Sequence, residues 1–162
     1  MTPGWQRQAA AAVALQCFAA PLPATEERGQ ETEVLEAVFR QQIDEHLDPS
    51  ARARHTVVCL GIDPGGAPQS PSPEFMARFR GQPAARRLAE CDRRATGAVE
   101  AMTLRPAILV TAGPIDWVAE DEAWVTVAYF RTRSESATRR YRVVRERTGW
   151  VSLGPIILDG PS

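Results

Sequence analysis

The 162-residue chain contains no lysine and no asparagine, so all 19 of its basic residues are arginines. Without lysine there can be no Walker A phosphate loop, no Schiff-base lysine and no kinase-type catalytic lysine. Without asparagine there is no acceptor for N-glycosylation. The charges nearly balance, with 20 acidic residues and a formal net charge of -1, which favours neither a nucleic-acid partner nor an anionic membrane surface.

The chain also lacks an apolar run long enough to span a bilayer. The nearly uncharged segment over residues 9–22 would extend about 21 Å as a helix, against a bilayer core of about 30 Å. This segment follows one cation, Arg7, and precedes a small residue, Ala24, an order typical of a secretory signal peptide. We therefore predict a signal peptide over residues 1–24, cleaved after Ala24, and export to the periplasm or the cell exterior. The alternative interpretation is an alanine-rich helix that packs on the domain.

Cysteine is scarce, and its positions bear on the compartment. Cys17 lies in the predicted signal peptide, and Gln16 before it is not the small residue that a lipoprotein anchor requires. Export would leave Cys59 and Cys91, a pair compatible with one disulfide. Closing this loop of about 33 residues would stabilise the fold by about 3–4 kcal/mol. The alternative is two separate thiols, with Cys59 buried as a small hydrophobic residue.

The rest of the chain indicates a single domain over residues 32–158, preceded by a flexible, acidic lead-in over residues 25–31. Apolar residues at steps of three and four predict an amphipathic helix from Thr32 to Leu47. The next segments are predicted as a buried strand, a loop rich in proline and glycine, and a short helix: 56–62, 63–73 and 73–79.

From residue 98 onward the apolar residues alternate, as they do in half-buried strands. Turn signals divide this region into five predicted strands: 98–104, 107–118, 123–131, 138–147 and 150–158. Gly113-Pro114 indicates a bulge or break within the second of them. The predicted fold class is α+β, with the N-terminal amphipathic helix packed on a mostly antiparallel, curved sheet that ends in a meander.

The closing segment, RRYRVVRERTGWVSLGPIIL, resembles the last hairpin of nuclear-transport-factor-like α+β domains. The residues that carry the resemblance are Tyr141, Val143, Gly149, Trp150, Val151 and Leu153. The resemblance implies a curved sheet wrapped around a helix and enclosing a pocket. The chain departs from that family in having one strand between its two helices, and it lacks an Asp/His pair, so no catalytic residue is transferred. As a whole the chain resembles short exported proteins of arginine-rich bacterial proteomes.

Candidate catalytic and metal-binding residues are few. GIDPG, residues 61–65, resembles the first-strand motif of RuvC-type Holliday-junction nucleases, in which the aspartate binds a divalent metal. Such a site needs further carboxylates that the sequence does not offer in a recognisable motif, so we interpret Asp63 as the cap of a turn. His55 and Cys59 are four residues apart, so on one strand they would share a face and could form a Cys–His nucleophile. The sequence shows no third group that would orient the histidine. Structural zinc sites use cysteine or histidine ligands that come in closely spaced pairs. The possible ligands in this chain are not spaced in that way: His46, His55, Cys59 and Cys91. We predict no catalytic residue, metal or cofactor.

Arginine is concentrated between residues 131 and 147, where seven of the nineteen lie. At this density arginine side chains could hold a phosphate or carboxylate. The candidates for binding an anionic ligand or acidic partner are Arg139, Arg140, Arg142 and Arg145. The alternative is a solvated strand face, partly paired with neighbouring acids such as Asp116 and residues 120–122.

These observations predict an exported, non-enzymatic domain that binds a small-molecule ligand or an acidic partner, and no nucleic acid. The alternative is a small periplasmic or secreted enzyme with a pocket under the N-terminal helix, using Asp63, His55 or an arginine as its polar group. An enzyme should show a cavity with converging polar groups. The enzyme hypothesis therefore requires Asp63, His55 and Cys59 to line a common cavity.

Overall fold

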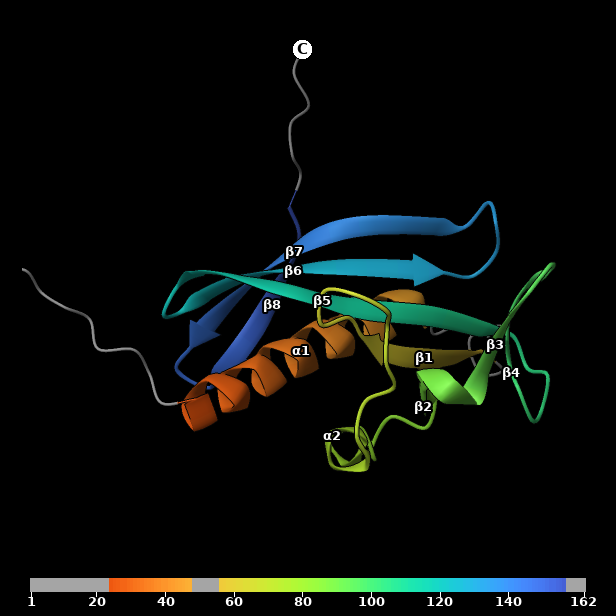
Figure 1. Ribbon diagram of the computed structural model, residues 1–162, viewed down its shortest axis with the longest axis horizontal. Coiled ribbons are helices and arrows are strands. Elements are labelled where there is room, and N and C mark those ends of the chain that lie inside the picture. The colour runs from red at the N-terminus through yellow and green to blue at the C-terminus, as the bar shows by residue number, and fades with distance from the viewer. Residues whose placement is uncertain (1–23, 48–55, 157–162) are drawn as a thin grey trace, which may run out of the picture.

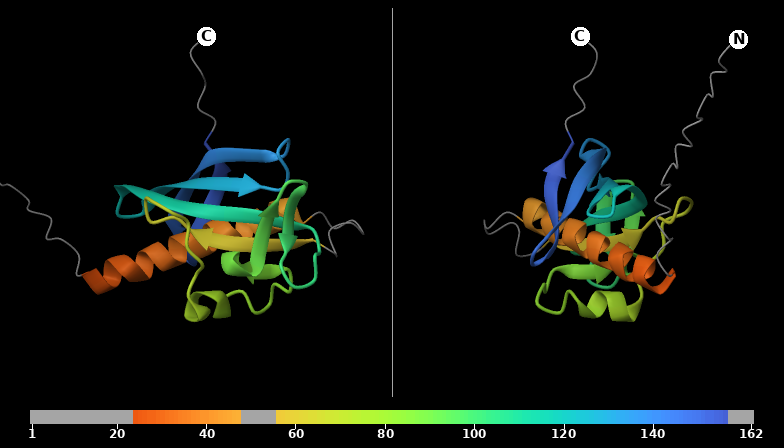
Figure 2. Two further views of the ribbon diagram at one scale, coloured as in Figure 1. Left: turned by 45° about the vertical axis from the view of Figure 1, so that its right-hand side comes forward. Right: turned by 90° about the vertical axis from the view of Figure 1, so that its left-hand side faces the viewer.

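The computed structural model describes residues 24–47 and 56–156. Helix α1 (Ala24–His46) lies across one face of a curled β-sheet, as Figures 1 and 2 show. The predicted apolar stripe of this helix is buried against the sheet: Val34, Leu35, Val38, Phe39 and Ile43. The space between α1 and the centre of the sheet is thus filled by packed apolar side chains.

Helix α1 begins at Ala24, not at Thr32, so residues 25–31 are helical where the sequence analysis placed a flexible lead-in. Glutamate, glutamine and arginine are good helix formers, and acidic residues are favoured in a first helical turn by the helix dipole. The predicted cleavage position therefore coincides with the start of the helix. Residues 1–23 lie outside the described residues, and the signal peptide stays a prediction.

Strands dominate the remainder of the chain. They are β1 (Val57–Ile62), β2 (Ala85–Arg87), β3 (Cys91–Arg94), β4 (Gly97–Glu100), β5 (Ala107–Ala119), β6 (Glu122–Phe130), β7 (Ser136–Glu146) and β8 (Gly149–Pro155). Six of them form one sheet in the order β2-β1-β5-β6-β7-β8, and β3 pairs with β4 in a separate hairpin. Strand β1 is parallel to both β2 and β5, and the other neighbours are antiparallel. The α+β class and the mostly antiparallel, curved sheet are confirmed, and the sheet is mixed.

The predicted strands after residue 98 correspond to β4 through β8. The register of β5 shifts between Ala112 and Ile115, which confirms a bulge at Gly113-Pro114. A Cβ atom at Gly113 would overlap the carbonyl group of Asp63, and its φ of +118° favours glycine. The short helix α2 (Pro73–Ala77) is also present, capped by the Ser72 hydroxyl, which accepts a hydrogen bond from the Phe75 N–H at 3.2 Å.

Strands β2 and β3 are absent from the sequence prediction. Both are short, and both are rich in arginine, which breaks the apolar alternation by which strands are recognised. Between them lies the 3-10 helix η2 (Leu88–Glu90). Across the described residues, no helix combines the length and the hydropathy needed to cross a membrane.

The two faces of the six-stranded sheet have different coverings. One face carries α1 and most of the apolar core. The opposite face is partly covered by the β3–β4 hairpin, which buries a smaller cluster consisting of Val57, Cys59, Ala98, Ala107 and Phe130. Beside this hairpin the sheet face is left open.

Candidate ligand groove on the open face of the sheet

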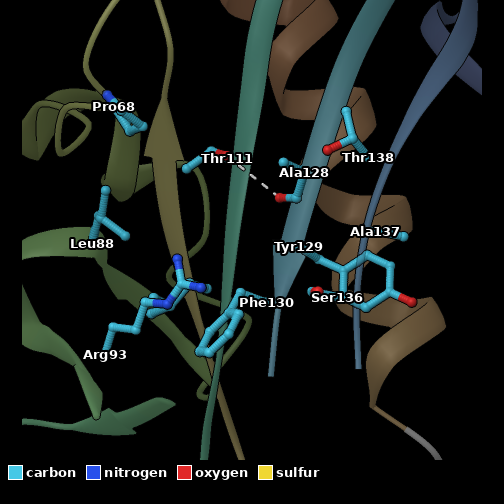
Figure 3. Close-up of a pocket in the computed structure, with 11 residues that line it drawn as sticks. Pro68, Leu88, Arg93, Thr111, Ala128, Tyr129, Phe130, Ser136, Ala137 and Thr138 are labelled. Carbon is cyan, nitrogen blue, oxygen red and sulfur yellow. Dashed lines mark hydrogen bonds between the residues drawn. The ribbon is translucent and has the colours of Figure 1, made fainter. Parts of the chain in front are cut away.

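A groove of about 430 Å³ runs over the open face of the sheet, opposite α1 (Figure 3). Strands β5, β6 and β7 form its floor, and the loop after β1 and helix η2 form one wall. Its lining residues are Pro68, Leu88, Arg93, Leu109, Thr111, Ala128, Tyr129, Phe130, Ser136, Ala137 and Thr138. A volume of this size is typical of small-molecule sites.

The groove exists because small residues meet across three strands. Thr111 of β5 pairs with Ala128 of β6, and Ala128 pairs with Thr138 of β7. Directly paired residues on neighbouring strands project from the same face, so these three side chains form one low row. The adjacent row contains the larger Leu109 and Phe130. The difference in height between the two rows leaves a trough over Ala128.

The wall formed by η2 depends on a glycine in β1. A Cβ atom at Gly61 would lie 2.7 Å from Cδ2 of Leu88 and 3.0 Å from Cγ2 of Thr111. Glycine at this position lets Leu88 pack directly on the backbone of β1. The wall is further fixed by the Ala89 N–H, which donates to the Ser70 hydroxyl at 2.7 Å.

Arg93 is the charged side chain of the groove. The guanidinium carbon lies 3.8 Å from the centroid of the Phe130 ring, a close cation–π stack. Along β3, Asp92 and Arg94 project to the opposite face of the strand, where they pair at 3.6 Å. Within the described part of the chain, no carboxylate forms a salt bridge with Arg93. Arg93 is not among the residues predicted from the sequence, although its position two residues after Cys91 could have indicated it.

Strand β3 is held to the sheet by a disulfide between Cys59 and Cys91, which confirms the predicted pairing. The two Cα atoms lie 6.4 Å apart, and Cys59 of β1 is fully buried. Because β3 pairs only with β4, this bond is a direct cross-link between β3 and β1 of the main sheet. A bridged sulfur offers no thiolate, so Cys59 is not available as a nucleophile or a zinc ligand in this state.

The other sequence-predicted polar residues lie apart from the groove. Asp63 accepts hydrogen bonds from the N–H groups of Gly65 and Gly66 at 2.9 and 2.8 Å, the turn that the sequence analysis favoured. Asp63 lines a separate cavity of about 240 Å³ near the N-terminal half of α1. His46 lies on the α1 side of the sheet, its ring 4.7 Å from that of Tyr129. His55 lies outside the described residues.

The structure therefore does not bring Asp63 and Cys59 into one cavity. Cys59 is sealed beneath the β3–β4 hairpin, whereas Asp63 lies at the far end of β1. Among the residues that the structure describes, no three His, Cys, Asp or Glu side chains converge on a point that could hold a metal ion.

The four arginines proposed as an anion site alternate between the two faces of β7. Arg140 and Arg142 project to the open face, while Arg139 and Arg145 share the other face with the buried Tyr141. Arg140 pairs with Asp116, and its guanidinium carbon lies 4.8 Å from the Trp124 ring centroid.

Arg142 binds both carboxylate oxygens of Glu122, at 2.9 and 2.8 Å. These hydrogen bonds lower the pKa of Glu122 below its ordinary value. Two of the four candidates are thus already paired within the molecule, and the cation left without a carboxylate partner at the groove is one that the sequence analysis did not name.

A buried carboxylate, that of Glu100, stabilises the fold near β4. Glu100 accepts hydrogen bonds from Arg105 at 3.0 Å and from Arg86 at 2.6 Å, and it also contacts the Thr103 hydroxyl. The hydrogen bond from Arg105 is the largest cause that lowers the pKa of Glu100 to about 2. The Glu100 carboxylate is therefore fully paired with the guanidinium groups of Arg86 and Arg105, and the cluster has a structural role.

Comparisons of the chain with protein-family models, with curated proteins and with solved structures find no match. The resemblance of the closing hairpin to nuclear-transport-factor-like domains accordingly stays an expectation, and support for a function comes from the geometry of the groove.

Proposed function

We propose that this protein is an exported, non-enzymatic domain that binds a small-molecule ligand in the groove on the open sheet face. The observation that carries the proposal is the trough over Ala128, bounded by the stacked Arg93 and Phe130. Cross-strand rows of small residues beside large ones produce a concave, partly apolar surface, which is what ligand sites require.

The chemical character of the lining supports binding without turnover. The groove offers one guanidinium group, the hydroxyl groups of Thr111, Ser136 and Thr138, and apolar side chains. Its eleven lining residues include no carboxylate, imidazole or thiol, the groups that most often transfer protons or attack substrates. Export is supported by the Cys59–Cys91 disulfide, because such bonds persist in oxidising compartments.

Fragment titration followed by amide NMR tests this proposal. Small aromatic and aliphatic fragments are added at about millimolar concentration, at which a binding free energy of roughly -4 kcal/mol can be detected. They should shift the amide resonances of Thr111, Ala128 and Thr138. Replacing Ala128 with Tyr should abolish the shifts, because the larger side chain fills the trough. Thr126→Tyr is the matched control, since it lies on the same strand and the same face but outside the lining.

Shifts that survive in Ala128→Tyr, or the absence of any shift at the groove, would overturn the proposal. Mass spectrometry of each fragment that binds, after prolonged incubation with the protein, distinguishes binding from catalysis. Chemical conversion of a fragment that depends on the groove would favour the alternative of a small exported enzyme.

A further inference from the structure

The stacked arginine in the groove points to the chemical class of the ligand. Arg93 supplies the one charged side chain among the lining residues. Figure 3 shows its guanidinium group directed toward Phe130 at the end of the trough. Stacking uses the face of the guanidinium plane, and the N–H donors lie in that plane, so their edges remain able to bind an anion.

Acidic groups on the neighbouring elements have other partners. Asp92 of β3 pairs with Arg94, and Glu90 of η2 accepts a hydrogen bond from the Arg87 N–H at 3.1 Å. Glu135, before β7, pairs with Arg131 at 3.5 Å. Among the described residues Arg93 therefore has a cation–π contact with the Phe130 ring and no ion pair with a carboxylate. A ligand that supplies a carboxylate would complete the site, because planar, two-oxygen anions match the fork of guanidinium donors.

The remainder of the groove fits an apolar, flat body. From Arg93 the trough runs over Ala128 between Leu88 on one wall and Thr138 on the other (Figure 3). The low floor leaves room for a ring, and the hydroxyl groups of Thr138 and Ser136 lie at the opposite wall for a second polar contact.

We propose that the groove selects small organic carboxylates with a planar apolar body, the carboxylate bound by Arg93 and the body lying over Ala128. This inference rests on the proposed function of the groove and adds the charge and shape of its ligand.

The test compares 2-naphthoate with 2-naphthalenemethanol, which has the same ring system and a neutral polar group. Affinities are measured by NMR titration of the oxidised protein at neutral pH. We expect naphthoate to bind about tenfold or more tightly than the alcohol, because a hydrogen bond to a charged partner exceeds a neutral one by about that factor. Added sodium chloride should weaken naphthoate binding and leave the alcohol unchanged.

Arg93→Gln should reduce naphthoate to the affinity of the alcohol. Arg93→Lys, which keeps the charge but not the planar fork, should retain part of the preference. Arg94→Gln is the matched control, because Arg94 is the adjacent arginine on the opposite face of β3 and should leave both affinities unchanged. Thermal unfolding of each variant confirms that the fold is intact.

Equal affinities of the two compounds in the natural protein, or a preference that persists in Arg93→Gln, would overturn the inference. In either case shifts at Thr111, Ala128 and Thr138 would show that the groove still binds small molecules, so the proposed function would stand. If neither compound nor any fragment shifts these amides, both proposals fail together.

Discussion

Reducing the Cys59–Cys91 disulfide should lower the free energy of unfolding by about 3–4 kcal/mol. The bond closes a loop with a sequence separation of 32 residues, and the chain-entropy relation assigns that stabilisation to a loop of this length. Reduction removes no atoms from the core, so it isolates the covalent constraint. The protein is small enough for a two-state analysis.

The measurement is urea unfolding with and without a phosphine reductant, with the thiol content checked by mass under non-reducing conditions. For a urea dependence of about 1.5–2 kcal/mol per molar, the midpoint should fall by about 2 M. Replacing both cysteines with Ala should give a similar or larger loss, because Cys59 is fully buried and its sulfur would leave a small cavity. The reductant should have no effect on this double variant.

The structure adds a local expectation. Strand β3 pairs only with β4, so reduction should shift the amide resonances around Arg93 more than those of β6 and β7. An unchanged urea midpoint after verified reduction would refute the claim that this bond constrains the unfolded chain. Two thiols already titratable in the untreated native protein would refute the bond itself.

Three further outcomes are expected. Gly61→Val should destabilise the fold by about 1–3 kcal/mol in urea unfolding and weaken naphthoate binding, because the valine side chain would displace Leu88 from the groove wall. Unchanged stability would show that Leu88 does not pack on β1 as described. The pKa of Glu100 is lowered to about 2, so its stabilisation is fully present above the unfolded-state value near 4.5 and is lost as the pH falls from about 5 toward 2. Glu100→Gln should therefore cost about 1–3 kcal/mol at neutral pH and flatten the fall in melting temperature over that acid range, and an equally steep fall in the variant would contradict this assignment. Intact-mass measurement of the natural protein should give a chain that begins at Thr25, and retention of residues 1–24 would refute the predicted cleavage after Ala24.

The sequence determines the elements whose pattern is local. Apolar spacing predicted the core stripe of α1, and alternation predicted β1 and the strands from β4 to β8. The start of α1 was placed too late, because the helix-forming residues before Thr32 carry charge and no apolar stripe. The predicted signal peptide would contain Cys17 and leave two cysteines, which is why a Cys59–Cys91 disulfide was a candidate before any distance was known.

Only part of the candidate site could be predicted from the sequence. A dense run of arginines in β7 indicated either an anion site or a strand face paired with nearby acids, and the structure pairs Arg140 with Asp116 of β5 and Arg142 with Glu122 of β6. The cation at the groove, Arg93, stands in a short polar strand with no periodic signal. Its environment depends on a hairpin folded back over the sheet and bonded to β1.

By itself, then, the sequence determined the α+β class and the strand alternation, since both follow from neighbours along the chain, and counting made the cysteine pair a candidate. Only the tertiary structure decided that β1 lies parallel to β5 and that Thr111, Ala128 and Thr138 meet in one row. Alternation assigns side chains to two faces of a strand, but the pairing register and the covering of each face arise from contacts between segments far apart in the sequence. The groove is a product of that register.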